Sequence, residues 1–352
     1  MRFKKKVNHY RRHLMNRLTK RIGQSNLKTN DISKKHLVKR VLVCRPNHRL
    51  GNLLLITPLL QEITELFPNA KIDVVVQGGL APILFKEYEN SDRIISLPKK
   101  GLKYPFQYVK GVLSIRKNKY DIAISAVKSS SSGRLFTLFS KSEYKIFGED
   151  DDQYLSDKYD DYSHIAKKQV YGFREYLYQL GYPEITRPVA PLNLKLSDAE
   201  RLKGQQIVDN LVGNDKKTIC IFTFATGHKC FLECWWADFY ARLQKEFPDY
   251  NIIEILPKEN VSQIQFKAPS FYSGDVREIA AVIASTKLFI GADSGIMHLS
   301  CASGAPTVGL FSVTKVDKYK PYFNGTPLDT RVKDLDASMT LINTVLSKHQ
   351  LN

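Results

Sequence analysis

The chain has 352 residues, enough for about two domains, and its 43% hydrophobic and 25% charged residues are the balance of a folded globular protein. No apolar run approaches the roughly 18 residues that a membrane-spanning helix needs, and no apolar core of a secretory signal follows the charged N-terminus. The five cysteines lack C-x-x-C spacing, which favours a reducing compartment. A disordered chain and a transmembrane protein are thereby excluded, and the net charge of +18 remains to be explained.

The positive charge is concentrated at the N-terminus. Residues 1–40 hold 14 Lys and Arg and a single acid, Asp31, whereas the rest of the chain is nearly balanced. Apolar residues recur at steps of three and four from Phe3 to Ile22, which predicts an amphipathic helix with cations around its apolar stripe. Such a basic arm suits an anionic membrane surface. A solvated tail, a helix packed on the body and a nucleic-acid-binding arm are the alternatives, and the absence of an aromatic-basic reader motif in the body argues against the last.

Short apolar runs alternate with helical patterns from Val41 onward. The first series predicts strands at 41–44, 72–76, 93–96 and 121–125 and helices at 53–66, 80–88 and 106–116. Because the runs show no polar alternation, the sheet should be parallel and covered on both faces. The acidic segment 149–163 is expected to be an exposed loop, followed by a helix at 165–180 and a proline-marked linker that ends near Pro191.

A second α/β series follows the linker. It predicts helices at 197–211, 235–247, 276–284 and 296–303 and strands at 218–222, 251–256, 288–291 and 307–310. Two series indicate two doubly wound α/β domains, 41–190 and 191–330, facing one another across a cleft, with the basic arm (1–40) before them and a C-terminal helix (331–352) after them. Ligands of such sheets bind in the loops after the carboxyl ends of strands, so the loops after Cys44, Phe222 and Gly291 are the candidate site.

The loop after Gly291 reads A-D-S-G-I-M-H and has the strongest pattern. Asp293 and Ser294 are good caps for the helix that follows, and Gly295 would let the first helical amides cradle a phosphate. His298 lies in the first helical turns and could donate to the same anion. An ordinary N-cap beside a buried histidine is the structural alternative.

The other two loops are weaker signals. After Phe222, Thr226 could donate a hydrogen bond to a phosphate and Lys229 could supply a point charge, although a polar loop with an exposed lysine is the commoner case. After Cys44, Gly51 would let the backbone approach a ligand where a helix begins. That loop is neither G-x-G-x-x-G nor a Walker loop, so the usual dinucleotide and P-loop interpretations lose support.

In this order and on this architecture, the loops resemble those of glycosyltransferase family 9, the ADP-heptose:lipopolysaccharide heptosyltransferases. The stretch R-L-G-N-L-L-L-I-T-P is similar to the family's opening R-x-G-D-x-x-x-x-x-P pattern, and S-G-D-V-R-E-I-A is similar to the lead into its donor motif. The stretch D-S-G-I-M-H-L-S-C-A-S-G-A-P-T matches that donor motif, D-[ST]-G-x-x-H followed by P-T. The likeness runs from about Val41 to Pro321 and leaves out the basic arm.

The resemblance implies a GT-B fold, in which the N-terminal Rossmann-like domain binds the acceptor and the C-terminal one the nucleotide-sugar. It implies an inverting transfer of a sugar, heptose, from ADP-heptose to a lipopolysaccharide core or similar lipid-linked glycan, with no metal and no other cofactor. The implied donor-binding residues are Thr226, Lys229, Glu259, Asp293, Ser294, Gly295 and His298, of which Glu259 would hold the ribose hydroxyls. The implied acceptor-binding residues are Arg49 and Gly51.

The chain departs from the family in the spacing between Lys229 and Trp235, where the family more often places its tryptophan soon after the basic residue, and more importantly at one position of the first loop. Where the family usually has an aspartate as catalytic base, this chain has Asn52, whose amide cannot deprotonate a hydroxyl at neutral pH. His48, in the same loop, has a suitable ordinary pKa to replace the base while Asn52 orients the acceptor, and these two are the predicted catalytic residues. A slow enzyme that relies on positioning and a catalytically impaired nucleotide-sugar or glycan-binding protein are the alternatives.

The basic arm and the implied lipid-linked acceptor both indicate where in the cell the protein works. Both predict a peripheral protein on the inner, cytoplasmic face of the bacterial cytoplasmic membrane, held there by residues 1–40 and without a nucleic-acid partner.

Overall fold

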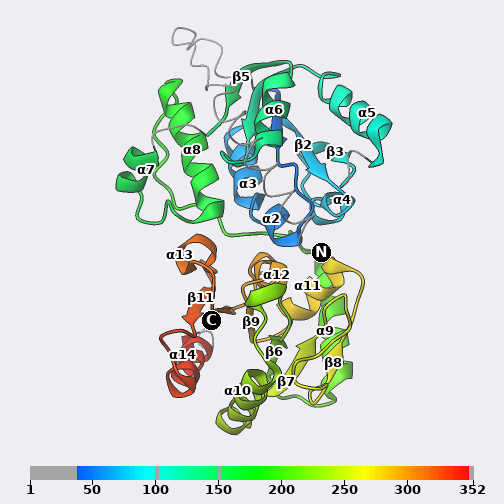
Figure 1. Cartoon of the computed structure of the whole chain (residues 1–352), viewed down its shortest axis with the longest axis vertical. Helices are drawn as coiled ribbons and strands as arrows, with labels where there is room; N and C mark the ends of the chain where they lie inside the picture. Colours follow the sequence, from blue (N-terminus) through cyan, green and yellow to red (C-terminus); the bar gives the residue numbers. More distant parts are fainter. Residues whose placement is uncertain (1–37, 100–102, 149–151, 349–352) are drawn as a thin grey trace, which may run out of the picture. The chain divides into compact units, whose positions relative to one another are not determined.

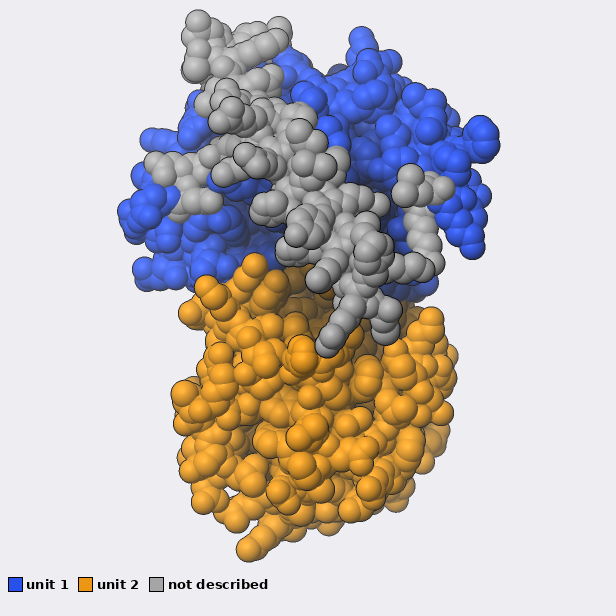
Figure 2. Space-filling view, in the orientation of Figure 1, with its two compact units in different colours: residues 1–48, 58–190 blue, residues 49–57, 191–352 orange. Residues whose placement is uncertain are grey.

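The computed structural model describes residues 38–99, 103–148 and 152–348, so the predicted amphipathic arm lies almost entirely outside the described residues. The chain divides into two compact units (Figure 2), of which unit 1 comprises residues 1–48 and 58–190 and unit 2 comprises residues 49–57 and 191–352. Arg40, counted above with the arm, is the first residue of strand β1 (Arg40–Cys44). Within the described part of the chain, no helix is long and apolar enough to cross a membrane.

Unit 1 is built on one parallel sheet (Figure 1). Besides β1, its strands in the described residues are β2 (Lys71–Gln77), β3 (Ser91–Leu97), β4 (Tyr120–Ser125) and β5 (Ser142–Ile146). Their order is β3-β2-β1-β4-β5, and every pairing is parallel, as the uninterrupted apolar runs predicted. The order reverses between β1 and β4, which makes the loops after these two strands the switch point of the sheet.

Helices surround this sheet. They are α3 (Thr57–Leu66), α4 (Ala81–Leu84), α5 (Pro105–Ile115), α6 (Ser131–Phe139), α7 (Asp152–Lys158) and α8 (Ile165–Gln179). The expectation that 149–163 is a loop was wrong in part, since α7 occupies its middle, where the Lys158 ammonium at the end of the helix lies 2.7 Å from Glu184. Strand β5 and helix α6 were not predicted, because the apolar residues of β5 are interspersed with Ser, Glu and Lys and those of α6 with Ser, Gly, Arg and Thr.

A buried ionic cluster closes the amino-terminal edge of the unit 1 sheet. Asp73, near the start of β2, is fully buried and lies 3.0 Å from the Arg40 guanidinium and 3.4 Å from that of Arg93. Asn118 and Tyr120 donate further hydrogen bonds to the same carboxylate, at 3.0 and 2.8 Å. A buried charge held by this many donors at the edge remote from the ligand-binding loops is a structural element.

Unit 2 contains a second parallel sheet. Its strands in the described residues are β6 (Thr218–Phe222), β7 (Asn251–Ile255), β8 (Ser270–Phe271), β9 (Leu288–Ala292), β10 (Thr307–Phe311) and β11 (Gly325–Asp329). The order β8-β7-β6-β9-β10-β11 corresponds to the 3-2-1-4-5-6 order of a Rossmann fold, with its switch point between β6 and β9. The prediction of an α/β protein with two Rossmann-like domains is confirmed.

The helices of unit 2 include one that the sequence order would place elsewhere. They are α2 (Leu50–Leu54), α9 (Asp198–Val212), α10 (Glu233–Glu246), α11 (Val276–Ala284), α12 (Gly295–Ser303), α13 (Val316–Tyr319) and α14 (Leu335–Lys348), with a 3-10 turn, η3 (Gly227–Lys229). Residues 49–57, expected within the first domain, pack instead in unit 2, where α2 lies against α12.

The single helix expected at 53–66 is broken into α2 and α3. Pro58 cannot donate a backbone hydrogen bond and disfavours helical geometry at the residue before it, Thr57. The Thr57 hydroxyl donates to the Leu54 carbonyl at 2.7 Å and accepts from the Asn193 amide at 3.2 Å, so it satisfies backbone groups at the break.

Candidate functional site

The site of unit 2 is centred on Asp293, the residue after β9. Its carboxylate is almost buried, and one oxygen, Oδ2, accepts from the Lys229 ammonium at 2.6 Å and from the Thr314 hydroxyl at 2.8 Å. Lys229 follows β6 and Thr314 follows β10, so three neighbouring strands each contribute one member at their carboxyl ends. The switch point of the sheet, where Rossmann-like folds bind ligands, thus carries a fixed acid–lysine–threonine cluster.

The Lys229 ammonium is held in place and still reaches solvent. Its side chain is 35% exposed, whereas that of Asp293 is 4% exposed. The ammonium also lies 5.5 Å from the centre of the Tyr319 ring, at the end of α13, which is within cation–π range. A buried carboxylate and an aromatic face orient this cation, and the exposed side remains available to an anionic ligand.

His298 lies behind the cluster as a neutral imidazole. Its Nε2 is 3.9 Å from Asp293 Oδ1, too far for a hydrogen bond, and its side chain is 6% exposed. Burial, with a smaller contribution from the Lys229 charge, lowers the pKa of His298 to about 4 against the opposing effect of Asp293. At neutral pH this ring therefore offers one N–H donor and one acceptor and no positive charge.

The amino end of α12 completes the site. Ser294 is its N-cap, because its Oγ accepts from the Met297 amide at 3.3 Å. The expectation that Asp293 also caps this helix was wrong, since its carboxylate is turned to Lys229 and Thr314 instead. The first amides of the helix, those of Gly295 and Ile296, have no acceptor within the helix and carry the positive end of its dipole.

Gly51 is required by packing against this helix. A Cβ at Gly51 would lie 2.8 Å from His298 Cδ2, and a Cβ at Gly295 would lie 3.2 Å from Leu50 Cβ and 3.3 Å from the Gly51 nitrogen. The two glycines therefore let α2 and α12 meet backbone to backbone. Gly51 was predicted to bind the acceptor, and the structure places it beside His298, a residue predicted to bind the donor.

For the remaining predicted residues, the structure gives the element and the exposure. His48 and Arg49 are exposed on either side of the boundary between the units, and Asn52 is half-buried in α2. Thr226 is exposed and precedes η3 without capping it, and Glu259 is exposed in a turn after β7. Of the eleven candidates, Lys229, Asp293, Ser294, Gly295 and His298 are brought together, with Gly51 packed against them.

Sequence reasoning missed Thr314 and Tyr319. Both follow β10, whose carboxyl end lies beside that of β9. Once the strand order is known, residues after β10 are expected near Asp293. It also missed a buried network under the same loops, in which Glu254 accepts from the hydroxyls of Thr223 at 2.6 Å and Ser262 at 2.7 Å. Burial raises the pKa of Glu254. The network ties the loop after β6 to the loop after β7.

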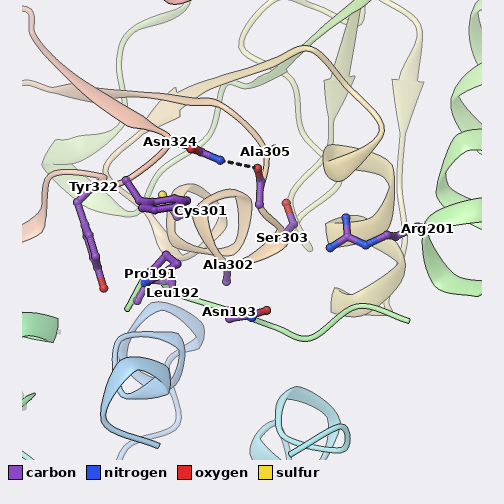
Figure 3. A pocket seen from close by; sticks show the side chains of 12 residues that line it. Pro191, Leu192, Asn193, Arg201, Cys301, Ala302, Ser303, Ala305, Tyr322 and Asn324 are labelled. Atoms are coloured by element: carbon purple, nitrogen blue, oxygen red, sulfur yellow. Dashed lines mark hydrogen bonds between the residues drawn. The ribbon is translucent and has the colours of Figure 1, made fainter. Parts of the chain in front are cut away.

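A pocket of about 160 Å³ lies at the opposite end of α12 (Figure 3). It is lined by residues such as Leu192, Cys301 and Tyr322, and the Asn324 side chain closes one side by donating to the Gly304 carbonyl at 3.3 Å. Its walls carry no cluster of charged groups, so it is not the continuation of the Asp293 site.

Comparison with known proteins identifies the same region. Residues 272–327 match the sequence model of glycosyltransferase family 9 (heptosyltransferase), and this segment includes Asp293, His298, Thr314 and Tyr319. The chain is also 25% identical over 294 residues to lipooligosaccharide heptosyltransferase 2 of Campylobacter jejuni, which covers 78% of this chain and 82% of the relative. In this segment, and more weakly over most of its length, the chain is similar to glycosyltransferase family 9.

The fold agrees with this assignment. The crystal structure of a family 9 glycosyltransferase from Veillonella parvula superposes with a TM-score of 0.68 at 19% identity, covering 89% of this chain and 99% of that one. Heptosyltransferase II of E. coli superposes with a TM-score of 0.59 at 15% identity, with the same coverage. The expected GT-B class is thus confirmed, and the matches to family 9 and to the heptosyltransferases support a glycosyltransferase.

Proposed function

We propose that the protein is a family 9 glycosyltransferase that moves a heptose from ADP-heptose to the core glycan of lipopolysaccharide or lipooligosaccharide. One observation carries the proposal: the Lys229 ammonium, oriented by Asp293 at the switch point, lies in the loops beside the amino end of α12. A diphosphate leaving group needs positive and hydrogen-bonding groups of this kind. The relatives support the sugar, since a similarly folded E. coli heptosyltransferase, WaaC, was solved with ADP-2-deoxy-2-fluoro heptose.

In the proposed reaction the acceptor hydroxyl attacks the anomeric carbon with inversion, and ADP leaves. Lys229 and the amides of Gly295 and Ile296 take up the charge that develops on the diphosphate, while the neutral His298 ring holds the end of α12 in place. Thr226 and Glu259, exposed on neighbouring loops, are proposed to contact the phosphate and the ribose. In this proposal the protein itself supplies the positive groups that neutralise the leaving diphosphate, and the transfer therefore needs no metal.

The acceptor proton is proposed to go to His48. Asn52 has no basic atom, and His48 is an exposed imidazole at the end of the loop after β1. Arg49 is proposed to bind the anionic acceptor. We also propose that residues 1–40 attach the enzyme to the inner face of the cytoplasmic membrane, because their 14 cations and single acid complement anionic lipids.

The donor proposal is tested by calorimetric binding of ADP, UDP and GDP to the wild type and to Lys229→Met. ADP is expected to bind most tightly, and Lys229→Met is expected to weaken ADP about tenfold to a hundredfold, since hydrogen bonds to charged groups contribute about 1.5–3 kcal/mol. Lys287→Met is the matched control, because Lys287 is an exposed lysine just before the other end of β9. Equal losses in the two variants would contradict the assignment of Lys229.

Transfer is measured with ADP-heptose and heptose-deficient core glycan, with and without a chelator. Heptosylated product that forms equally in both is expected, and dependence on added metal would contradict the metal-free reaction. His48→Ala is expected to abolish transfer without weakening ADP binding. ADP-heptose binding with no transfer to any core acceptor would favour the alternative that Asn52 raises, a catalytically impaired nucleotide-sugar-binding protein.

A further inference from the structure

The outer face of α5 in unit 1 exposes a row of large apolar side chains. Phe106 is 90% exposed, Leu113 56% and Val109 53%. Their spacing, i, i+3 and i+7, puts all three on one face of the helix. Single exposed apolar residues are common, whereas a contiguous row on one helix marks a surface that meets a partner.

The inner face of α5 packs against the sheet and core of unit 1. Ile115 is fully buried, and the Tyr108 ring lies 6.3 Å from that of Phe136 in the core of unit 1. Gly111 faces Leu97 of β3 so closely that a Cβ there would lie 2.5 Å from Leu97 Cδ2. These contacts hold the helix on the sheet without any help from the exposed row, so the row is not explained by folding.

Cations flank the row, and acids are absent from the segment. Residues 103–120 hold no Asp or Glu and five basic residues, which are Lys103, Lys110, Arg116, Lys117 and Lys119. Lys103, Lys110 and Lys117 are exposed. The Lys103 ammonium lies 5.6 Å from the centre of the Tyr104 ring, so a cation and an aromatic side chain stand together at the start of the helix. We call Phe106, Val109 and Leu113 with these three lysines the α5 surface.

We propose that the α5 surface docks on an anionic lipid bilayer, with its apolar row in the boundary between headgroups and acyl chains and its lysines on the phosphates. This combination of an apolar stripe and flanking cations is what an interfacial helix requires. The contact is separate from the basic arm and does not depend on which sugar the enzyme transfers.

Charge argues against the other occupants of this surface. The basic arm carries 14 cations and one acid, so it would be repelled by five further cations, and a second copy of the α5 surface would be repelled in the same way. A nucleic acid would pair with the lysines but gains little from Val109 and Leu113, because bases stack on aromatic rings. An anionic lipid surface satisfies both the charge and the aliphatic side chains.

The test is sedimentation of the full chain with phosphatidylcholine–phosphatidylglycerol vesicles. The triple variant Phe106→Ser, Val109→Ser, Leu113→Ser is expected to lower the partition coefficient at least about tenfold, since three apolar side chains lose their burial. The matched control replaces an exposed Phe, Val and Leu of unit 2 with serine, namely Phe323, Val332 and Leu202, and is expected to bind like the wild type.

Residues 1–40 are present in every variant and could bind vesicles by themselves. A second measurement therefore detects membrane contact at α5 alone. Tryptophan in Phe106→Trp is expected to be quenched by brominated lipids, whereas tryptophan in Phe323→Trp is not. Equal quenching in the two proteins, or a serine triple that sediments like the control triple, would overturn the proposal. So would a result in which Lys103→Glu, Lys110→Glu, Lys117→Glu abolishes binding to an oligonucleotide and leaves vesicle binding intact.

Discussion

Two buried aspartates, one in each unit, show how position in a sheet separates structure from function. Asp73 is fully buried and Asp293 is 4% exposed, and each is paired with a cation whose side chain is partly exposed. Asp73 lies near the start of β2, and its partners, Arg40 and Arg93, lie at the starts of neighbouring strands. Asp293 follows the end of β9, and its partner Lys229 lies in a loop.

The difference lies in what else is present at each edge. At the amino edge of the unit 1 sheet, the Asp73 carboxylate is saturated by donors from strands and a tight connection, so its network closes the fold. At the carboxyl edge of the unit 2 sheet, three loops and the start of α12 converge, so Asp293 orients groups that still face solvent. Similar ion pairs therefore have different consequences, decided by which end of the strands they occupy.

The largest effect is expected at Asp73. Asp73→Asn should lower the free energy of unfolding by about 3 kcal/mol, because it leaves Arg40 and Arg93 without their shared buried partner. ADP affinity should not change, since Asp73 belongs to the other unit. Denaturant unfolding and calorimetry measure the two quantities.

Asp92→Asn is the control, because Asp92 pairs with the same Arg40 at 2.7 Å but is 30% exposed. It should lower the free energy of unfolding by about 1 kcal/mol or less. A weakened ADP affinity in Asp73→Asn would break the comparison.

A smaller effect is expected at Gly51. Gly51→Ala puts a Cβ 2.8 Å from His298 Cδ2, and should lower the free energy of unfolding by about 1–3 kcal/mol through overpacking and also weaken ADP binding. Gly79→Ala is the control, since a Cβ there has no heavy atom within 4 Å, and it should be nearly neutral. Adding His298→Ala should recover part of the loss in Gly51→Ala. Strict additivity in this double-mutant cycle would show that the two residues do not meet.

A pH dependence is expected from His298, and at neutral pH its effect is the smallest of the three. Because burial lowers its pKa from an ordinary 6.5 to about 4, the unfolded chain binds more protons than the folded chain between these values. The free energy of unfolding should therefore be highest above pH 6.5 and fall as the pH drops towards 4. The steepest slope expected from this one group is about 1.4 kcal/mol per pH unit.

Unfolding free energies at several pH values measure this contribution. His298→Asn should remove it, and His228→Asn, which changes an exposed histidine of the same unit, should keep the wild-type profile. An unchanged pH profile in His298→Asn would mean that the imidazole is not held neutral by burial.

Much of the fold could be predicted because apolar runs without polar alternation require a covered parallel sheet. The strands around Val41, Ile219 and Ile290 were all foreseen on this basis, whereas β5, with Glu143 and Lys145, was not. The loop after β9 was recognisable because helix capping and the D-S-G-I-M-H pattern are local. Thr314 and Tyr319 were out of reach, because Thr314 lies 21 positions after Asp293 and Tyr319 lies 90 positions after Lys229, and no local pattern joins residues so far apart.

The sequence by itself determined the two α/β series, the family likeness and the loops that carry chemistry, since these depend on periodicity and on short motifs. Tertiary structure decided the rest. It packed Gly51 of α2 against α12, and it paired Asp293 with Lys229, where the sequence had predicted a helix cap. Burial also keeps His298 neutral. Burial, strand order and the pairing of charges depend on contacts between distant segments, and only the folded chain brings those segments together.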